Sequence, residues 1–285
     1  MATIIAAACQ KGGVGKTTNS TNLAAYLARL GKKVLFVDLD PQANGTAIFL
    51  GKVAAYAAEP DHKSIYHGLL MGEPVNKLIQ KVPLRVWRQN DFQPTDKTID
   101  IVPSHRNVDA AEVELAGEPQ GEVRLRKLLR PALGKYDYII LDCPPSLGLL
   151  TLNALTVASH VIIPCDPGEF PLVGLVQLMK TIEFVRGDGD PEDALNRNLK
   201  IMGIVLSKAD AYGATLRTYE RLTEIYKDLI LPNIPLRTIV KDSQEAYVDV
   251  FGFTGVDPAN IPESANDFVK AIAAVGQEVM KREHK

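Results

Sequence analysis

The sequence predicts an α/β fold: a single doubly wound, mostly parallel sheet with helices on both faces. Three observations predict it. Short apolar segments alternate with amphipathic ones, the first apolar segment runs into a glycine-rich loop, and two later apolar segments end in aspartate. Alternation of this kind is typical of parallel sheets that helices cover. We expect residues 1–285 to form one domain, with a surface excursion at about 51–97.

Apolar runs bounded by turn residues predict the strands. The first run, Thr3–Cys9, is almost entirely apolar, as in a parallel strand that is buried on both faces. By the same criterion we expect strands at 3–9, 33–38, 98–103, 137–142, 160–165, 199–206 and 236–240.

Helical periodicity predicts the elements between these strands. Leu23, Leu27 and Leu30 recur at helical spacing, and Gly31 follows them as a natural C-terminal cap. We expect helices at 16–30, 121–133, 147–157, 171–186, 213–230, 242–250 and 263–282. The excursion at 51–97 is rich in proline, and we expect one short helix in it near 64–71.

Composition excludes several classes of protein. The net charge of −2 gives no overall field for nucleic acid, so any basic surface must be local. Cys9, Cys143 and Cys165 form no C-x-x-C pair, which argues against iron–sulfur, zinc and disulfide roles and favours small buried thiols. We find no secretory signal and no apolar run of the roughly 18 residues that span a bilayer. We therefore expect a cytoplasmic protein.

A phosphate-binding loop lies between the first strand and the first helix. An ordinary Walker A motif, G-x-x-x-x-G-K-[ST], would have glycine at position 10, where this chain has Gln10. A glycine pair and an additional lysine follow instead. Backbone N–H groups at the start of a helix bind phosphate, so this loop predicts nucleotide binding. The predicted phosphate-binding residues are Lys11, Gly12, Gly13, Val14, Gly15, Lys16, Thr17 and Thr18.

Aspartates follow two of the predicted strands. Asp38 and Asp40 come at the end of the strand at 33–38, and Asp142 ends the strand at 137–142. Carboxyl ends of parallel strands border the crevice where α/β sheets bind ligands. Asp142 has the Walker B form and is expected to hold Mg²⁺ directly or through a water, while Asp38 and Asp40 order metal-bound and attacking water. The alternative is that each aspartate merely caps a turn.

Together, three motifs resemble those of the ParA/Soj partition ATPases, members of the deviant-Walker class that also contains MinD. The motifs are Lys11–Thr18, Val37–Asn44 and Leu141–Ser146, and the resemblance runs from Thr3 to about Val279. It implies ATP and Mg²⁺ as cofactors and a homodimer that sandwiches two ATP molecules. It further implies slow hydrolysis stimulated by a ParB-like partner, and sequence-nonspecific DNA binding on the nucleoid in the ATP state, for plasmid or chromosome segregation.

The resemblance also implies a role for each motif residue. Lys11 would reach the phosphates of the partner subunit, and Lys16 would hold the β- and γ-phosphates of its own subunit's ATP. Thr17 would ligate Mg²⁺, and Asp40 would orient the hydrolytic water. Asp38 and Asp142 would arrange the metal. Lys11, Lys16, Asp38 and Asp40 are thus the expected catalytic residues, and Thr17, Asp38 and Asp142 the expected metal residues.

Two later segments are the expected base contacts. Ser207–Asp210 follows the strand at 199–206 and resembles the Asn-Lys-x-Asp guanine motif, and in the partition family this loop lies against adenine. A second segment, Ile239–Ser243, would assist it. The expected base contacts are Lys208, Asp210, Val240 and Asp242. The alternative is that Lys208 and Asp210 simply form a surface pair after the strand.

A basic segment provides the expected DNA contacts. Residues 199–241 contain seven Lys and Arg against four Asp and Glu. Arg217 and Arg221 are four residues apart on one face of the predicted helix at 213–230, so we expect them to contact DNA. The alternative is an ordinary solvated helix face, on which Glu220 and Glu224 pair with the arginines.

Two other functions remain open at this stage. Related ATPases position a protein cargo, such as a chemoreceptor array or a microcompartment, and they share these motifs. A MinD-like membrane-associated regulator of cell division would need a terminal amphipathic helix with bulky apolar residues. The segment 275–285 offers little apolar surface, so we expect no stable membrane binding.

Overall fold

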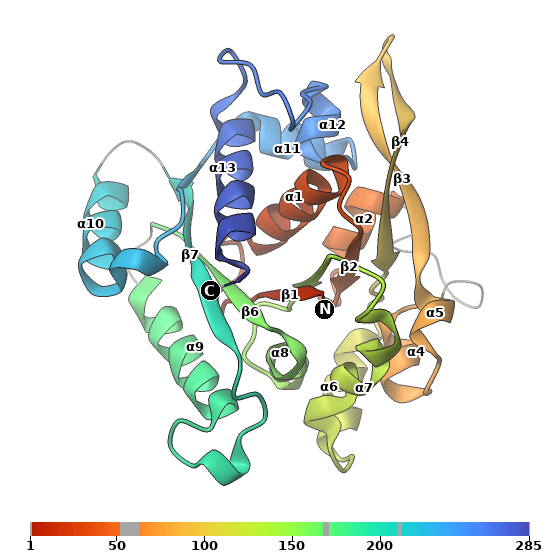
Figure 1. Cartoon of the computed structure of the whole chain (residues 1–285), viewed down its shortest axis with the longest axis vertical. Coiled ribbons are helices and arrows are strands. Elements are labelled where there is room, and N and C mark those ends of the chain that lie inside the picture. Colours follow the sequence, from red (N-terminus) through yellow and green to blue (C-terminus); the bar gives the residue numbers. More distant parts are fainter. Residues whose placement is uncertain (1, 52–62, 168–170, 210–212, 285) are drawn as a thin grey trace.

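A single mixed sheet organises the chain in the computed structural model (Figure 1). The structure describes residues 2–51, 63–167, 171–209 and 213–284. Within them the strands lie in the order β3-β4-β2-β5-β1-β6-β7-β8, and neighbours are parallel except for the antiparallel pair β3 and β4. The strands are β1 (Thr3–Ala7), β2 (Val34–Asp38), β3 (Gln80–Arg88), β4 (Asp91–Val102), β5 (Tyr138–Asp142), β6 (His160–Cys165), β7 (Lys200–Ala209) and β8 (Ile234–Pro235).

Helices cover both faces of this sheet, as predicted. In Figure 1 the helices α1 and α11 to α13 lie above the sheet, and α4 to α9 lie below it. The helices are α1 (Lys16–Arg29), α2 (Asn44–Leu50), α4 (Ile65–Leu70), α5 (Val75–Leu78), α6 (Val108–Ala116), α7 (Arg124–Leu129), α8 (Leu149–Val157), α9 (Pro171–Arg186), α10 (Ala214–Tyr226), α11 (Thr238–Glu245), α12 (Val250–Thr254) and α13 (Asp267–Arg282).

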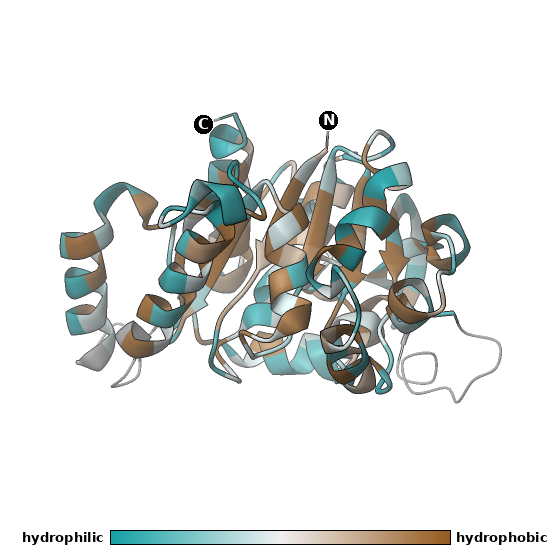
Figure 2. Cartoon of the chain, turned by 90° about the horizontal axis from the view of Figure 1, so that it is seen from below, coloured by the Kyte–Doolittle hydropathy of each residue, from teal (hydrophilic) through white to brown (hydrophobic). Residues whose placement is uncertain are grey.

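The apolar strand sequences follow from burial on two sides. Successive side chains of β1 alternate between two cores: Ile4 and Ala6 pack against α8 and its neighbours, and Ile5 packs against α1. Helical residues turn their apolar sides to the strands (Figure 2). Burying each large aliphatic side chain contributes about 1.5–3 kcal/mol, so an uninterrupted apolar strand is favoured only between two helical layers. The three cysteines are also buried, as predicted.

Three central strands end side by side. Ala7 of β1 pairs with Asp142 of β5, and Asp142 pairs with Asp38 of β2. Both ends of the chain lie at the same edge of the molecule (Figure 2), the edge at which β1 begins. The predicted motifs therefore gather at the opposite edge, where the parallel strands end.

The structure corrects the prediction for the excursion at 51–97. We expected one short helix there and a strand that began at residue 98. The helix is confirmed as α4, but β4 begins at Asp91 and forms a long hairpin with β3. Proline was the misleading signal, because an edge strand tolerates it. Pro83 lies in the edge strand β3, at a register shift, and Pro94 lies in β4 where the hairpin extends beyond β2.

A second correction concerns residues 236–250. We predicted a strand at 236–240 and a helix at 242–250. Instead, β8 is limited to Ile234–Pro235, α11 spans Thr238–Glu245, and α12 begins at Val250. Ile239, Val240 and Ser243 turn toward the interior at helical spacing, and this packing prevails over the strand preference of β-branched residues. Tyr247, with a φ of 52°, separates the two helices.

Other elements differ in detail. The helices α2, α5 and α6 were not predicted, so the excursion contains a second short helix besides α4. The helix expected at 121–133 consists of α7 between the 3₁₀ turns Gly121–Val123 and Arg130–Ala132. The helix expected at 213–230 is α10 followed by a 3₁₀ turn at Lys227–Leu229. The helices predicted at 16–30, 147–157, 171–186 and 263–282 are confirmed, within a few residues, as α1, α8, α9 and α13.

Candidate functional site

The glycine-rich motif forms the turn between β1 and α1. Gly13 and Gly15 have φ angles of 76° and 87°, which glycine adopts without strain. A Cβ atom on Gly15 would lie 3.4 Å from the Cβ of Ser207, so the turn packs closely on β7. Asn19 donates to the Ser207 hydroxyl at 2.6 Å and ties α1 to the same strand. The loop is thus fixed at the N-terminus of α1, where unpaired N–H groups and the helix dipole favour an anion.

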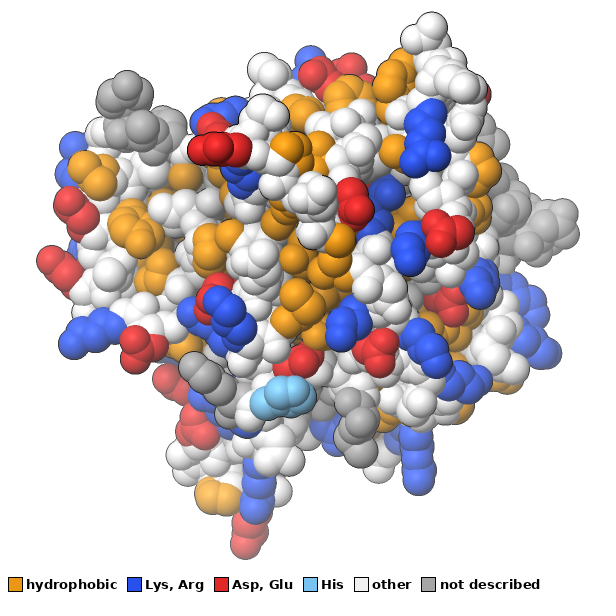
Figure 3. Space-filling model, turned by 45° about the horizontal axis from the view of Figure 1, so that its top comes forward, with side chains coloured by type: hydrophobic (Ala, Val, Ile, Leu, Met, Phe, Trp, Pro, Cys, Tyr) orange, Lys and Arg blue, Asp and Glu red, His pale blue; other side chains and the backbone are white. Residues whose placement is uncertain are grey.

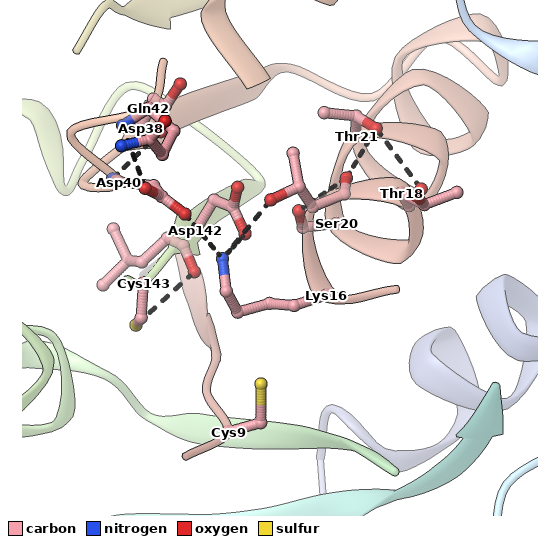
Figure 4. A network of polar contacts seen from close by, with 12 residues as sticks. Cys9, Lys16, Thr18, Ser20, Thr21, Asp38, Asp40, Gln42, Asp142 and Cys143 are labelled. Carbon is pink, nitrogen blue, oxygen red and sulfur yellow. Dashed lines mark hydrogen bonds and ion pairs between the residues drawn. The ribbon is translucent and has the colours of Figure 1, made fainter. Parts of the chain in front are cut away.

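Lys16 lies among the predicted aspartates (Figure 4). Its Nζ donates to Asp142 Oδ1 at 2.9 Å and lies 3.6 Å from Asp40 Oδ2. The same Nζ is 3.3 Å from the Thr17 hydroxyl oxygen. Asp38 ends the strand beside Asp142, in register with it. Lys16 is only 6% exposed. The structure therefore brings together all four charged residues that the motifs predicted here.

Burial and mutual repulsion control the charges in this cluster. Burial alone would lower the pKa of Lys16, but the Asp142 and Asp40 carboxylates outweigh it and raise the pKa, which retains the ammonium. Burial raises the pKa of Asp38 to about 7, and the Asp142 carboxylate adds to the shift. Burial also raises the pKa of Asp40, against the opposing effect of Lys16. A divalent cation here would favour the ionised forms of Asp38 and Asp40.

Asp142 and Thr17 present oxygens that suit a magnesium ion. The Asp142 Oδ2 atom is buried and has no hydrogen-bond partner among the described residues. Such an oxygen is costly, and a metal ion or its water shell would satisfy it. In the described ranges, no group of three or more His, Cys, Asp or Glu is arranged to hold a metal. Mg²⁺ typically uses one or two protein oxygens beside waters and phosphate oxygens.

Asp38 is held differently from the other two aspartates. Its Oδ1 accepts a hydrogen bond from the Asp40 backbone N at 3.1 Å. Its Oδ2 accepts from the Thr46 backbone N at 2.7 Å and from the Thr46 hydroxyl at 2.8 Å. Asp38 therefore belongs to the cluster, and both of its oxygens bind the segment that follows β2.

Lys11 has a more open environment. Its side chain is 55% exposed, and its Nζ forms an ion pair with Asp166 Oδ2 at 2.8 Å. Asp166 follows the last residue of β6. The additional lysine of the motif is thus paired at the surface of its own chain.

A cavity of about 730 Å³ adjoins the loop. One wall is formed by the loop and the start of α1, and the other by Lys208 and α11. Of the expected base contacts, Lys208 and Val240 line this cavity. Asp242 is exposed and does not line it, because residues two apart on a helix point in nearly opposite directions. Asp210 lies outside the described residues.

Sequence reasoning missed Gln244. Its Nε2 donates to the Thr18 hydroxyl at 2.9 Å and joins α11 to α1 beside the cavity. Val240 and Gln244 are four residues apart, so a helical reading of this segment would have placed them on one face. The strand predicted at 236–240 concealed this signal.

The expected DNA contacts lie apart from the cluster. Arg217 and Arg221 are exposed on α10, which lies at the left margin of the molecule in Figure 1. Glu220 and Glu224 are also exposed on this helix. Acidic and basic side chains are likewise intermixed over the face that Figure 3 presents. Because α10 exposes both basic and acidic side chains, its surface does not decide between DNA contact and an ordinary solvated helix face.

Comparison with known sequences gives consistent matches. A family model described as an AAA domain matches residues 2–201. The chromosome partitioning protein ParA of Myxococcus xanthus is 41% identical over 208 residues, which cover 73% of this chain and 65% of that protein. The sporulation initiation inhibitor protein Soj of Bacillus subtilis is 37% identical over 240 residues, 84% of this chain and 86% of Soj.

Solved structures share the architecture. A structure named cobyrinic acid a,c-diamide synthase, from Mycobacterium smegmatis with a bound ATP analogue and magnesium, has a TM-score of 0.73 at 26% identity. The match covers 99% of this chain and 95% of that one. Apo McdA from Cyanothece has a TM-score of 0.78 at 19% identity, covering 98% of this chain and 100% of that one, which is a likeness in fold alone.

Proposed function

Because this chain belongs to the ParA/Soj family of partition ATPases, we propose that it is an ATP-driven partition ATPase. In this proposal it binds ATP with Mg²⁺ and forms a homodimer around two ATP molecules. The dimer binds DNA without regard to sequence, which associates it with the nucleoid. A ParB-like partner stimulates its slow ATP hydrolysis, and the cycle segregates a plasmid or a chromosome.

The observation that carries this proposal is the position of Lys16. Its ammonium lies at the N-terminus of α1 and contacts Asp142 and Asp40. Phosphoryl transfer depends on positioned water and on cations near the γ-phosphate more than on covalent chemistry. Lys16 would bind the β- and γ-phosphates, and Asp40 would orient the attacking water. Mg²⁺, held by Thr17 and Asp142, would neutralise phosphate charge.

Lys11 connects hydrolysis to dimerisation in this proposal. Its side chain is exposed, so it could exchange its ion pair with Asp166 for a contact with a second subunit. A lysine supplied by the partner stabilises transition-state charge as an arginine finger does. ATP would then be part of the dimer interface, and its hydrolysis would release the interface.

Binding to DNA rather than to a membrane is supported by the exposed surface. Arg217 and Arg221 are exposed, so dimerisation would double the number of phosphates they contact. The apolar side of α13 is already buried, with Phe268, Ile272 and Val279 in the core. Within the described residues, no helix is long and apolar enough to cross a bilayer. These features favour nonspecific DNA binding without stable membrane association.

A phosphate-release assay tests this function directly. We expect slow hydrolysis of ATP by the purified chain, loss of activity with EDTA, and stimulation by DNA together with a ParB-like protein encoded beside the gene. Lys16→Ala is the control for contaminating activity. Absence of ATP hydrolysis under all these conditions would contradict the proposal. Hydrolysis without DNA binding in any nucleotide state would favour positioning of a protein cargo.

A further inference from the structure

The segment after β2 is closed into a loop by one carboxylate. Asp38 accepts a hydrogen bond from the Asp40 backbone N at 3.1 Å through Oδ1. Through Oδ2 it accepts from both the backbone N and the hydroxyl of Thr46, at 2.7 and 2.8 Å. Asp38 thereby anchors the start of the loop at Asp40 and its end at Thr46.

A third residue fixes the direction of this network. The backbone N of Ser104, two residues beyond β4, donates to the Thr46 hydroxyl oxygen at 2.9 Å. A backbone N–H can only donate, so the Thr46 hydroxyl accepts from Ser104 and directs its own proton to Asp38. Thr46 and Asp38 are fully buried, so water cannot replace a lost partner. The donor and the acceptor of each hydrogen bond in this network are therefore fixed.

The backbone of the loop is also sterically fixed. A Cβ atom on Gly45 would lie 2.7 Å from the Phe36 ring and 3.1 Å from Asp38 Oδ2, so glycine is required for this close approach. Ala43 has a φ of 51°, in the left-handed region, and its N donates to the Asp40 carbonyl at 2.9 Å. These constraints leave little freedom between Asp40 and Thr46.

We propose that Thr46 is a positioning residue for ATP hydrolysis, which acts through Asp38 to hold the loop that carries Asp40. Asp38 is then the anchor of this loop, in place of the metal-arranging role that the family resemblance implied. The inference rests on the proposed function, in which Asp40 orients the attacking water. None of these three hydrogen bonds involves the glycine-rich loop or α1, which bind ATP in that function.

Thr46→Val tests the role of the hydroxyl because valine keeps the shape and removes only the hydroxyl's hydrogen bonds with Asp38 and Ser104, while the backbone bond to Asp38 remains. We expect kcat for ATP hydrolysis to fall about 10- to 100-fold, since small misplacements of a reacting group have large effects. The KM for ATP should stay within about twofold, because an interaction needed only for catalysis is lost. Thr46→Ser, which keeps the hydroxyl, is the matched control and should retain kcat within about threefold.

Two further measurements separate positioning from a general loss of structure. Thermal unfolding of each variant checks the fold, and a titration with Mg²⁺ checks the metal. If Thr46→Val does not fold, Thr46→Cys repeats the test in a milder form, because a thiol is a weaker donor. We then expect Thr46→Cys to have a kcat below that of the wild type.

Three results would overturn the role of Thr46. One is a wild-type kcat in folded Thr46→Val, and another is an equal loss in Thr46→Ser and Thr46→Val. The third is recovery of kcat at high Mg²⁺, which would place Asp38 in the metal shell. A wild-type protein without ATPase activity would overturn the proposed function and this role together, so the two failures are distinguishable.

Discussion

The two lysines of the glycine-rich loop lie five residues apart but in opposite environments. Lys16 is buried and contacts Asp142 and Asp40, whereas Lys11 is 55% exposed and pairs with Asp166 at the surface. The carboxylates that contact Lys16 belong to Asp142 at the end of β5 and to Asp40 just beyond β2. Lys11 lies where a second molecule could reach it. In the proposed function, the buried Lys16 binds the phosphates of its own subunit, and hydrolysis depends on the exposed Lys11 of a second subunit.

The largest effect should come from loss of the buried lysine. Lys16→Ala removes the cation that binds the phosphates in the proposed function and leaves Asp40 and Asp142 to repel them. We expect the affinity for ATP to fall about 100-fold or more, since charge-assisted hydrogen bonds contribute about 1.5–3 kcal/mol. Titration with a fluorescent ATP analogue measures this. Lys11→Ala serves as the control and should still bind; Lys16→Ala binding within about threefold of wild type would remove the distinction between the lysines.

Removal of the Asp40 carboxylate should affect hydrolysis and spare binding. Asp40→Ala is expected to retain ATP and Mg²⁺ but to turn over about 100-fold more slowly, because the attacking water loses its acceptor. The ATP-bound dimer should persist correspondingly longer. Single-turnover phosphate release, followed by light scattering on the same sample, measures both properties. Hydrolysis at the parental rate would show that Asp40 does not position water.

The exposed arginines of α10 should affect DNA binding alone. We expect wild type to bind two unrelated duplexes equally, only with ATP, and to lose binding as salt rises from about 50 to about 200 mM. Arg217→Glu with Arg221→Glu should abolish this binding and leave basal ATPase activity unchanged. Fluorescence anisotropy of labelled duplexes measures DNA binding, and ADP in place of ATP is the control.

A matched variant tests whether the position of these charges matters. Lys127→Glu with Arg130→Glu makes the same charge change at exposed positions near α7 and should bind DNA almost normally. Full binding by the α10 variant, equal binding with ADP, or equal loss in both variants would count against the placement of the DNA surface on α10.

The smallest effect concerns a histidine at the start of β6. Burial, assisted by Lys200, lowers the pKa of His160 below its usual value. The unfolded chain therefore takes up this proton at a higher pH than the folded chain does. Stability should be retained above about pH 6.5 and should decline as the pH falls below it. Thermal unfolding at several pH values should show a shallower decline in His160→Gln; parallel curves would exclude His160 as the cause.

The sequence predicted the cluster around Lys16 because its geometry follows from strand order. Parallel strands that end in aspartate meet at one edge of the sheet, and a glycine loop between strand and helix lies at the same edge. Asp38 and Asp142 are thus neighbours by register, although 104 positions separate them in the sequence. The roles of these residues in catalysis stay predictions.

Other features depended on contacts that local pattern does not encode. Gln244 reaches Thr18 across 226 residues, and the first turn of its helix was predicted as a strand from its β-branched residues. Ser104 and Thr46 meet across 58 residues. The hairpin of β3 and β4 was concealed by prolines that its edge position tolerates. In each case tertiary packing selected the structure over local propensity.

Light scattering during size-exclusion chromatography tests most directly whether the exposed lysine works across a dimer. With a nonhydrolysable ATP analogue, we predict that wild type changes from monomer to dimer. Lys11→Ala should bind the analogue, as measured by fluorescence, and remain monomeric. A Lys11→Ala protein that binds the analogue and dimerises to the same extent as wild type would contradict the account.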